Sequence, residues 1–388
     1  MREIVSGVFY AGVDDKQIDL FEGMYKVPYG VSYNSYVIKD KKTAVVDSVD
    51  AHFGGEWLQK VESILGGAQP DYLIVQHMEP DHSACIDAFA KKYPNATVVG
   101  NQKTFVMLEE YFGPDIAKNR LTVKEGDMLD LGAHKLRFVF APMVHWPEVM
   151  VTYDESAKLL FSADAFGRFG ASDCPAQMFE SEARRYYIGI VGKYGAQVKA
   201  ALNKLGSYEI ETIASLHGGV LQGEELEKML RLYTLWSGYQ PEMPQGVLIA
   251  YASVYGHTKK AAQMLAEELE SKGEQAKLVD LTRDDWSECV AQAFRYPKLV
   301  VAATTYNADI FPAAREFIDR LSERNYQSRA VAFIENGTWA PVSAKLMKER
   351  FSKCKNLTFA QTEVKIRSAV NGESADKIKA LAEELVKL

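Results

Sequence analysis

A break in the sequence pattern between residues 237 and 246 limits the folds open to this chain more than any other feature. The stretch reads Ser237-Gly-Tyr-Gln-Pro-Glu-Met-Pro-Gln-Gly246, a mixture of Pro, Gly and polar residues that is typical of a linker. At 388 residues the chain is long enough for two or three domains that each bury a core. We therefore expect one domain over residues 1–244 and another over residues 245–388.

The two predicted domains differ in how strands and helices alternate. Before the linker, short apolar strands such as Thr97-Val-Val-Gly100 are mixed with helical patterns at residues 56–65, 83–92 and 197–205. This mixture favours an αββα sandwich of the α+β class. After the linker, nearly continuous apolar strands alternate regularly with amphipathic helices, which predicts an α/β domain with a doubly wound parallel sheet.

Composition disfavours several classes of protein. The net charge of −7 argues against a nucleic-acid or anionic-membrane partner, since such binding usually needs an excess of basic residues. No apolar stretch approaches the roughly 20 residues that span a bilayer, and the first residues lack the apolar core of a signal peptide. The four cysteines form no Cys-x-x-Cys pair, which disfavours a disulfide framework and a thiolate metal site. We expect a cytoplasmic protein with neither a nucleic-acid nor a membrane partner.

Four side chains that can bind metal ions follow one apolar strand within six residues. The strand pattern Asp71-Tyr-Leu-Ile-Val-Gln76 leads into His77-Met-Glu79-Pro-Asp81-His82, a segment too short and too interrupted by Pro to be a surface helix. A loop at a strand end can direct several side chains at one point. Carboxylates and imidazoles together favour a harder metal than thiolates would.

Single candidates follow three later apolar runs, namely His145, Asp164 and His217. A lone histidine beside a strand is usually a structural residue, and we expect this for His52 and His134, which have no motif around them. Clustered carboxylates and imidazoles are different, because holding them beside apolar strands is costly without a compensating cation. Four imidazoles and three carboxylates are enough ligands for two metal ions.

Three polar loops at strand ends predict a ligand pocket in the second domain. Because neighbouring parallel strands end at the same edge of a sheet, these loops should line one crevice, and a hydroxyl-rich turn before a helix can bind phosphate. An ordinary capped turn is an open alternative for the first loop, and a buried core position is one for Trp339. The candidate residues are Ser253, Val254, Tyr255, Gly256, His257, Thr258, Thr304, Thr305, Tyr306, Asn307, Asn336, Gly337, Thr338 and Trp339.

The first domain resembles the metallo-β-lactamase fold, whose first motif usually reads His-x-His-x-Asp-His, but Glu79 stands here in place of its second histidine. This variant and the flavodoxin-like second domain together resemble the flavodiiron proteins over essentially the whole chain, in a form without a rubredoxin extension. The resemblance implies FMN in the strand-end crevice and two non-haem iron ions. It assigns His77, Glu79 and His145 to one iron, Asp81, His82 and His217 to the other, and Asp164 to a bridge between them. Asp173-Cys174 departs from the family's acidic continuation, which leaves the role of that loop open.

The resemblance also implies an activity, the reduction of dioxygen to water, of nitric oxide to nitrous oxide, or of both. It implies a head-to-tail homodimer or a dimer of dimers, and a separate electron donor, either rubredoxin or reduced coenzyme F420. Tyr25 and Tyr194 are candidates for setting the preference between the gases. Two rival hypotheses are a zinc-dependent hydrolase fused to a flavodoxin domain, which leaves Glu79 unexplained, and an electron carrier without catalysis, which leaves the metal ligands unexplained.

Overall fold

The computed structural model describes all 388 residues and divides the chain into two compact units, Met1–Thr234 and Leu235–Leu388. The predicted domain boundary after residue 244 lies between helix α7 (Gly223–Ser237) and strand β18 (Val247–Tyr251), and it stays a prediction. None of the helices combines the length and the apolar run that crossing a bilayer requires.

The first unit is built around two β-sheets that pack face to face. The first sheet has the order β1 (Arg2–Val5), β2 (Val8–Tyr10), β7 (Tyr36–Ile38), β8 (Ala44–Val46), β9 (Tyr72–Ile74), β10 (Thr97–Gly100) and β11 (Arg120–Thr122). The second has the order β12 (Met128–Asp130), β13 (Lys135–Phe140), β14 (Met150–Asp154), β15 (Leu159–Phe161), β16 (Thr212–Ala214) and β17 (Leu221–Gln222). Apolar side chains from both sheets, such as Ile74 and Phe161, form one fully buried core.

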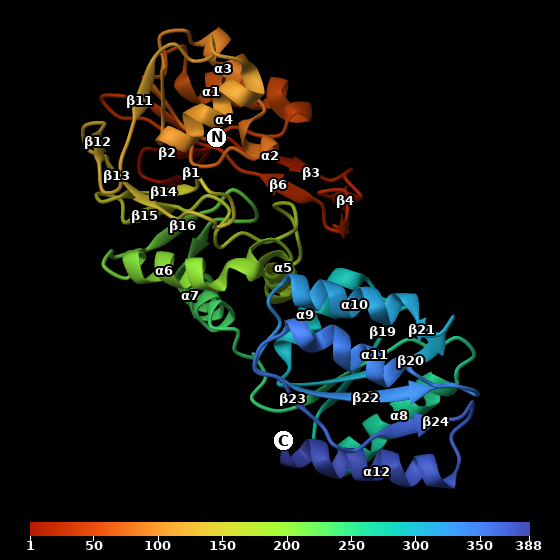
Figure 1. Ribbon diagram of the computed structural model, residues 1–388. Coiled ribbons are helices and arrows are strands. Elements are labelled where there is room, and N and C mark those ends of the chain that lie inside the picture. Colours follow the sequence, from red (N-terminus) through yellow and green to blue (C-terminus); the bar gives the residue numbers. More distant parts are fainter. The chain divides into compact units, whose positions relative to one another are not determined.

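Helices complete the αββα arrangement of the first unit. Figure 1 shows α1 (Gly54–Leu65), α3 (Ile86–Lys92) and α4 (Gln102–Phe112) on one side, and α6 (Gly195–Leu205) and α7 on the other. Two small hairpins near the amino terminus pair β3 (Val13–Asp15) with β6 (Val31–Tyr33), and β4 (Leu20–Phe21) with β5 (Tyr25–Lys26). The predicted sandwich is confirmed.

The second unit is a doubly wound sheet. Its order is β19 (Ala276–Asp280), β18, β20 (Lys298–Tyr306), β22 (Ala330–Asn336) and then β23 (Thr358–Phe359) and β24 (Val364–Ile366), all parallel, with β21 (Asp309–Ile310) folding back on β20. Helices α8 (His257–Ser271) and α12 (Gly372–Lys387) cover one face, and α9 (Trp286–Arg295), α10 (Pro312–Glu323) and α11 (Ser343–Arg350) cover the other (Figure 1). Strand order reverses between β18 and β20, which is where ligands bind in such sheets. The predicted parallel sheet is also confirmed.

One detail near the metal candidates differs from the sequence-based expectation. The strand before them is shorter than its apolar pattern suggested, Tyr72–Ile74, and residues Pro80–Ser83 form a single helical turn, α2. Pro80 occupies the first position of that turn, where the missing N–H costs nothing. The turn therefore places Asp81 and His82 one after the other against the buried side of the unit.

Candidate functional site

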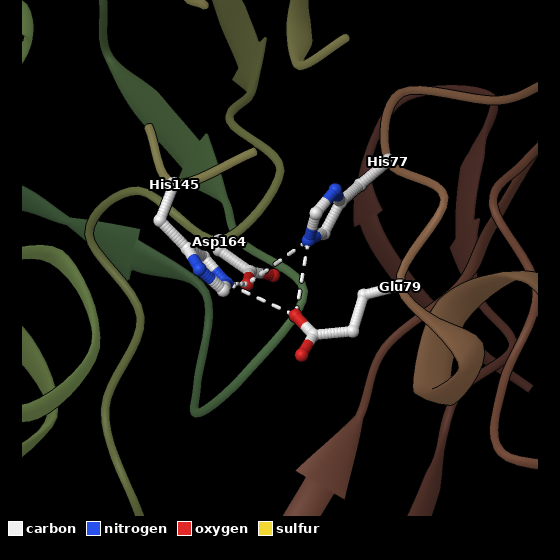
Figure 2. Close-up of side chains that lie close together, drawn as sticks. All are labelled: His77, Glu79, His145 and Asp164. Atoms are coloured by element: carbon white, nitrogen blue, oxygen red, sulfur yellow. Dashed lines mark hydrogen bonds and ion pairs between the residues drawn. The ribbon is translucent and has the colours of Figure 1, made fainter. Parts of the chain in front are cut away.

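Four of the predicted metal ligands meet at one point although they come from three separate loops. His77 and Glu79 follow β9, His145 lies between β13 and β14, and Asp164 follows β15. His145 Nε2 lies 3.0 Å from both Glu79 Oε2 and Asp164 Oδ2, and His77 Nε2 lies 3.1 Å from Glu79 Oε2. Figure 2 shows the two imidazoles and the two carboxylates directed at one another. This is a convergent set of nitrogen and oxygen donors.

The remaining three predicted ligands form a second group next to the first. Asp81 and His82 lie on α2, and His217 follows β16. The Nε2 atoms of His82 and His217 are 3.0 Å apart, and they lie 3.2 and 3.3 Å from Asp81 Oδ2. Asp164 stands between the groups, because its Oδ2 faces His145 while its Oδ1 lies 3.3 Å from His82 Nε2. A carboxylate with one oxygen toward each group has the geometry of a bridging ligand.

Electrostatics within the cluster keep the carboxylates of Asp164 and Glu79 ionised. Burial by itself would raise the pKa of Asp164, but the charges of His77 and His82 and a hydrogen bond from His145 hold the pKa well below its usual range. The pKa of Glu79 is lowered to about 2 in spite of burial, through hydrogen bonds from His145 and His77. The pKa of His145 is raised to about 9, since Asp164 and Glu79 outweigh its desolvation. Protons on His77, His145 and His217, whose pKa values are all raised, thus balance the buried carboxylates, and a metal cation can replace those protons.

Several buried polar atoms of the cluster fit metal ions. Both carboxylate oxygens of Asp81 and Oδ1 of Asp164 are buried without a hydrogen-bond partner, which is costly unless a cation or another donor satisfies them. The Nε2 atoms of His82 and His217 face each other, and in a hydrogen bond between them one must carry a proton while the other accepts it. Nitrogen and carboxylate donors without thiolate suit a pair of non-haem iron ions. The residues present therefore fit the group that the resemblance implies.

A cavity of about 620 Å³ in the second unit opens at the carboxyl ends of β18, β20 and β22, within the usual range for a small-molecule site. All the predicted loop residues line it except Gly256. Gly256 instead shapes the turn, because at φ +91° it precedes α8 in a conformation that favours glycine. The lining residues that sequence reasoning missed are Ala308, Ala340 and Ser368.

Aromatic side chains stand at the rim of this cavity. Trp339 is 81% exposed and Tyr255 is 89% exposed, so the alternative that Trp339 is a core residue is wrong. The first turn of α8 brings Thr258 into the cavity wall, and Asn336 donates a hydrogen bond to the Thr258 hydroxyl (3.2 Å). Unpaired N–H groups at a helix start, with hydroxyls and exposed rings nearby, suit a phosphate joined to a planar ring system. These features fit FMN.

Comparisons with known proteins assign both units to families. Residues 31–218 match the family "ODP family beta lactamase", and residues 248–367 match "Flavodoxin domain". An uncharacterized protein of Methanocaldococcus jannaschii is 31% identical over 92% of this chain and 90% of its own length. The nitric oxide reductase of Moorella thermoacetica is 29% identical over 98% of this chain and 97% of its own.

Solved structures agree over the full length of the chain. The flavodiiron protein of Giardia intestinalis matches with a TM-score of 0.92 at 25% identity, over 100% of this chain and 97% of its own. The chain belongs to the flavodiiron protein family. Rubredoxin oxygen:oxidoreductase from Desulfovibrio gigas gives the same TM-score and identity, over 100% of this chain and 98% of its own. The second domain of this flavodiiron chain is a flavodoxin domain.

Aromatic side chains that sequence reasoning did not name pack against His217 in this flavodiiron protein. Of the tyrosines that the sequence suggested, Tyr25 donates to the carbonyl of Gly189 (2.9 Å), and Tyr194 ends a short helical turn with Lys193 Nζ 6.0 Å from its ring centroid. The rings beside His217 instead belong to Phe21, Tyr33 and Tyr186, with centroids 5.4 to 5.9 Å away. Their helix and hairpin positions gave no local signal, so the sequence pattern missed them.

The two unassigned histidines lie apart from the cluster, as expected for structural residues. His52 is exposed and binds Asp50 (2.7 Å), and His134 lies 2.5 Å from the buried carboxylate of Asp154. In the loop that departs from the family pattern, Asp173 pairs with Lys16 (2.6 Å). That ion pair joins the loop to the segment after β3.

Proposed function

We propose that this flavodiiron protein is a terminal reductase that uses FMN and two iron ions to reduce dioxygen to water, nitric oxide to nitrous oxide, or both. The observation that carries the proposal is the position of Asp164, with one carboxylate oxygen toward each of two ligand groups. Two relatives support the two gases by name, one a nitric oxide reductase and the other a rubredoxin oxygen:oxidoreductase.

Each cofactor site has its own residues in this proposal. His77, Glu79 and His145 hold one iron, Asp81, His82 and His217 hold the other, and Asp164 bridges them. The three strand-end loops would hold FMN, with the start of α8 at its phosphate and Trp339 or Tyr306 stacked on its ring. When bound, FMN would accept two electrons and pass them on one at a time, and the iron pair would bind the gas that receives them.

The protein's own contribution is binding, orientation and exclusion of water. Phe21, Tyr33 and Tyr186 pack against His217, so that this side of the metal cluster is apolar. Apolar surroundings that exclude water would limit side reactions of a gas bound near the metal ions. The imidazole protons described above leave as the metal ions bind, because each ligand nitrogen must be free of its proton.

We further propose that a separate protein or reduced cofactor, rubredoxin or reduced coenzyme F420, donates electrons and that the protein works in the cytoplasm as a head-to-tail homodimer or a dimer of dimers. Support for an interface comes from the rim of the cavity, where Trp339, Tyr255 and Tyr306 expose large aromatic side chains. Exposed apolar clusters of this kind usually mark an interaction surface.

The decisive experiment combines composition with activity. Metal analysis and an ultraviolet–visible spectrum of the purified protein should give two irons and one flavin per chain. Consumption of dioxygen and of nitric oxide should then be measured side by side with a chemically reduced donor. Two zinc ions with hydrolytic activity would favour the metallo-hydrolase alternative, and flavin without iron or gas consumption would favour an electron carrier.

A further inference from the structure

A buried glutamate stands directly behind one of the four cluster imidazoles. Glu148 Oε1 lies 2.9 Å from Nδ1 of His77 and accepts a hydrogen bond from the Met78 backbone N–H (2.8 Å). Its side chain is fully buried, and the Asn101 amide fixes its backbone carbonyl. Figure 2 shows the second ring nitrogen of His77 turned away from the three other side chains drawn. Glu148 therefore binds the nitrogen that the metal cluster does not use.

The ligand side chains of the two groups carry equal charge. Each has two imidazoles and one carboxylate of its own, and they share Asp164. The two groups differ in what their imidazole Nδ1 atoms contact. Nδ1 of His217 donates to the neutral carbonyl of Ser32 (2.8 Å), and Nδ1 of His82 is buried without a partner. Glu148 thus places a carboxylate directly on the Nδ1 of one group's imidazole, whereas neither His82 nor His217 of the other group has a carboxylate there.

We propose that Glu148 is a positioning residue that makes the two metal sites unequal, so that the His77–Glu79–His145 site binds its metal more tightly than the Asp81–His82–His217 site. This inference rests on the proposed two-metal centre. A carboxylate that accepts the Nδ1 proton fixes the tautomer with a free Nε2 lone pair and raises the basicity of the imidazole. A carbonyl fixes the same tautomer but adds no net charge.

The substitution Glu148→Gln distinguishes an effect of the Glu148 charge from a purely structural role of its hydrogen bonds. In Glu148→Gln, the amide oxygen can still accept from both His77 and Met78, so that the loop keeps its hydrogen bonds while the charge is lost. If Glu148 only ties the loop, metal affinity should survive this change. If the charge matters, the tighter of the two metal affinities should fall.

The test is a Co²⁺ titration of metal-free, FMN-loaded protein against a competing chelator. Wild type should bind two equivalents with distinct affinities. Glu148→Gln should weaken the tighter one by about 10–100-fold, the usual effect of losing such a partner, and leave the weaker one within about twofold. The matched control is Asp47→Asn, an equally buried carboxylate that hydrogen-bonds Gln76 rather than an imidazole. An equal loss in the control, or no loss in Glu148→Gln, would overturn the proposal.

Two ligand variants identify the tight site without relying on Glu148→Gln. His217→Ala should keep the tight affinity, and His145→Ala should lose it; the reverse result would contradict the proposal, as would two equal affinities in wild type. Failure of wild type to bind any Co²⁺ would instead count against the two-metal centre itself. Far-ultraviolet circular dichroism and a thermal unfolding transition of the first unit confirm that each variant is folded.

Discussion

At the residue scale, Asp164 turns its two carboxylate oxygens toward different ligand groups. Asp164→Ala should therefore weaken both metal sites, by at least about tenfold each, since losing even an outer partner costs 10–100-fold. Iron content and gas consumption should both fall while FMN stays bound. The measurement is iron and flavin per chain in the purified variant.

The control for this prediction is His134→Ala. His134 pairs with Asp154 and has no contact with the cluster, so this variant should keep both irons. Full iron occupancy in Asp164→Ala would contradict the bridging role, and iron loss in His134→Ala would mean that the wrong imidazoles have been assigned to the metals.

Thr258 tests the other cofactor site. Its hydroxyl is buried in the cavity wall and accepts a hydrogen bond from Asn336. Thr258→Val should weaken FMN binding by about 1–3 kcal/mol, because the hydroxyl contact is lost and the Asn336 amide loses an acceptor. Fluorescence titration of flavin-free protein measures this. Thr258→Ser, which keeps the hydroxyl, should bind FMN within a few-fold of wild type; an equal loss in both variants would contradict a hydroxyl contact.

At the scale of elements, the His134–Asp154 pair joins the turn after β12 to the end of β14. The hydrogen bond to Asp154 raises the pKa of His134 above its ordinary value of 6.5. A raised folded-state pKa means that the pair stabilises the fold fully below about pH 6.5, and that this contribution is lost as the pH rises through the raised pKa. A hydrogen bond to a charged group is worth about 1.5–3 kcal/mol.

Chemical denaturation of the metal-free protein between pH 5 and 9 measures this contribution. The free energy of unfolding should differ most between wild type and His134→Gln at the acidic end, and the two should converge toward alkaline pH. A difference that grows with rising pH would show that the imidazole is neutral in the folded state.

The positions of the elements explain why sequence analysis missed several residues around the ligand cluster. Phe21 and Tyr186 approach His217 from the β4–β5 hairpin and from the end of α5 (Phe179–Tyr186), far away along the sequence. Neither segment carries a motif, and an aromatic residue in a hairpin or helix usually indicates only core packing. Glu148 was missed for the same reason, since its partner His77 lies 71 residues earlier.

At the scale of the whole molecule, the flavodoxin domain should fold alone. A fragment of residues 245–388 should be soluble and yellow, because its sheet is covered on both faces and has its own core. It should be less stable than residues 235–388, since buried Arg329 donates to the carbonyl of Tyr239 (2.7 Å) in the segment that is cut off. Urea unfolding compares the two. A colourless, insoluble product from both fragments would contradict an autonomous domain.

The proposed head-to-tail dimer predicts activity in trans. Mixing a chain defective in FMN binding, such as Thr258→Val with Asn336→Ala, with the iron-deficient Asp164→Ala should restore activity once subunits exchange, because each heterodimer contains one competent FMN–iron pair. Activity should rise in proportion to the heterodimer formed, measured by native mass spectrometry beside gas consumption. Heterodimers that form and stay inactive, while wild-type homodimers work, would show that electrons travel within one subunit.

The sequence by itself determined the two-part architecture, the seven clustered side chains and nearly all of the cavity lining. These features are local, because apolar periodicity defines each strand and polar residues directly after a strand lie at the edge of the sheet. Tertiary structure alone decided which oxygen of Asp164 faces which group, that Trp339 lies at a rim rather than in a core, and that Glu148 stands behind His77. Such contacts join residues far apart in the chain, and side-chain directions across packed loops follow from folding and leave no periodic trace in the sequence.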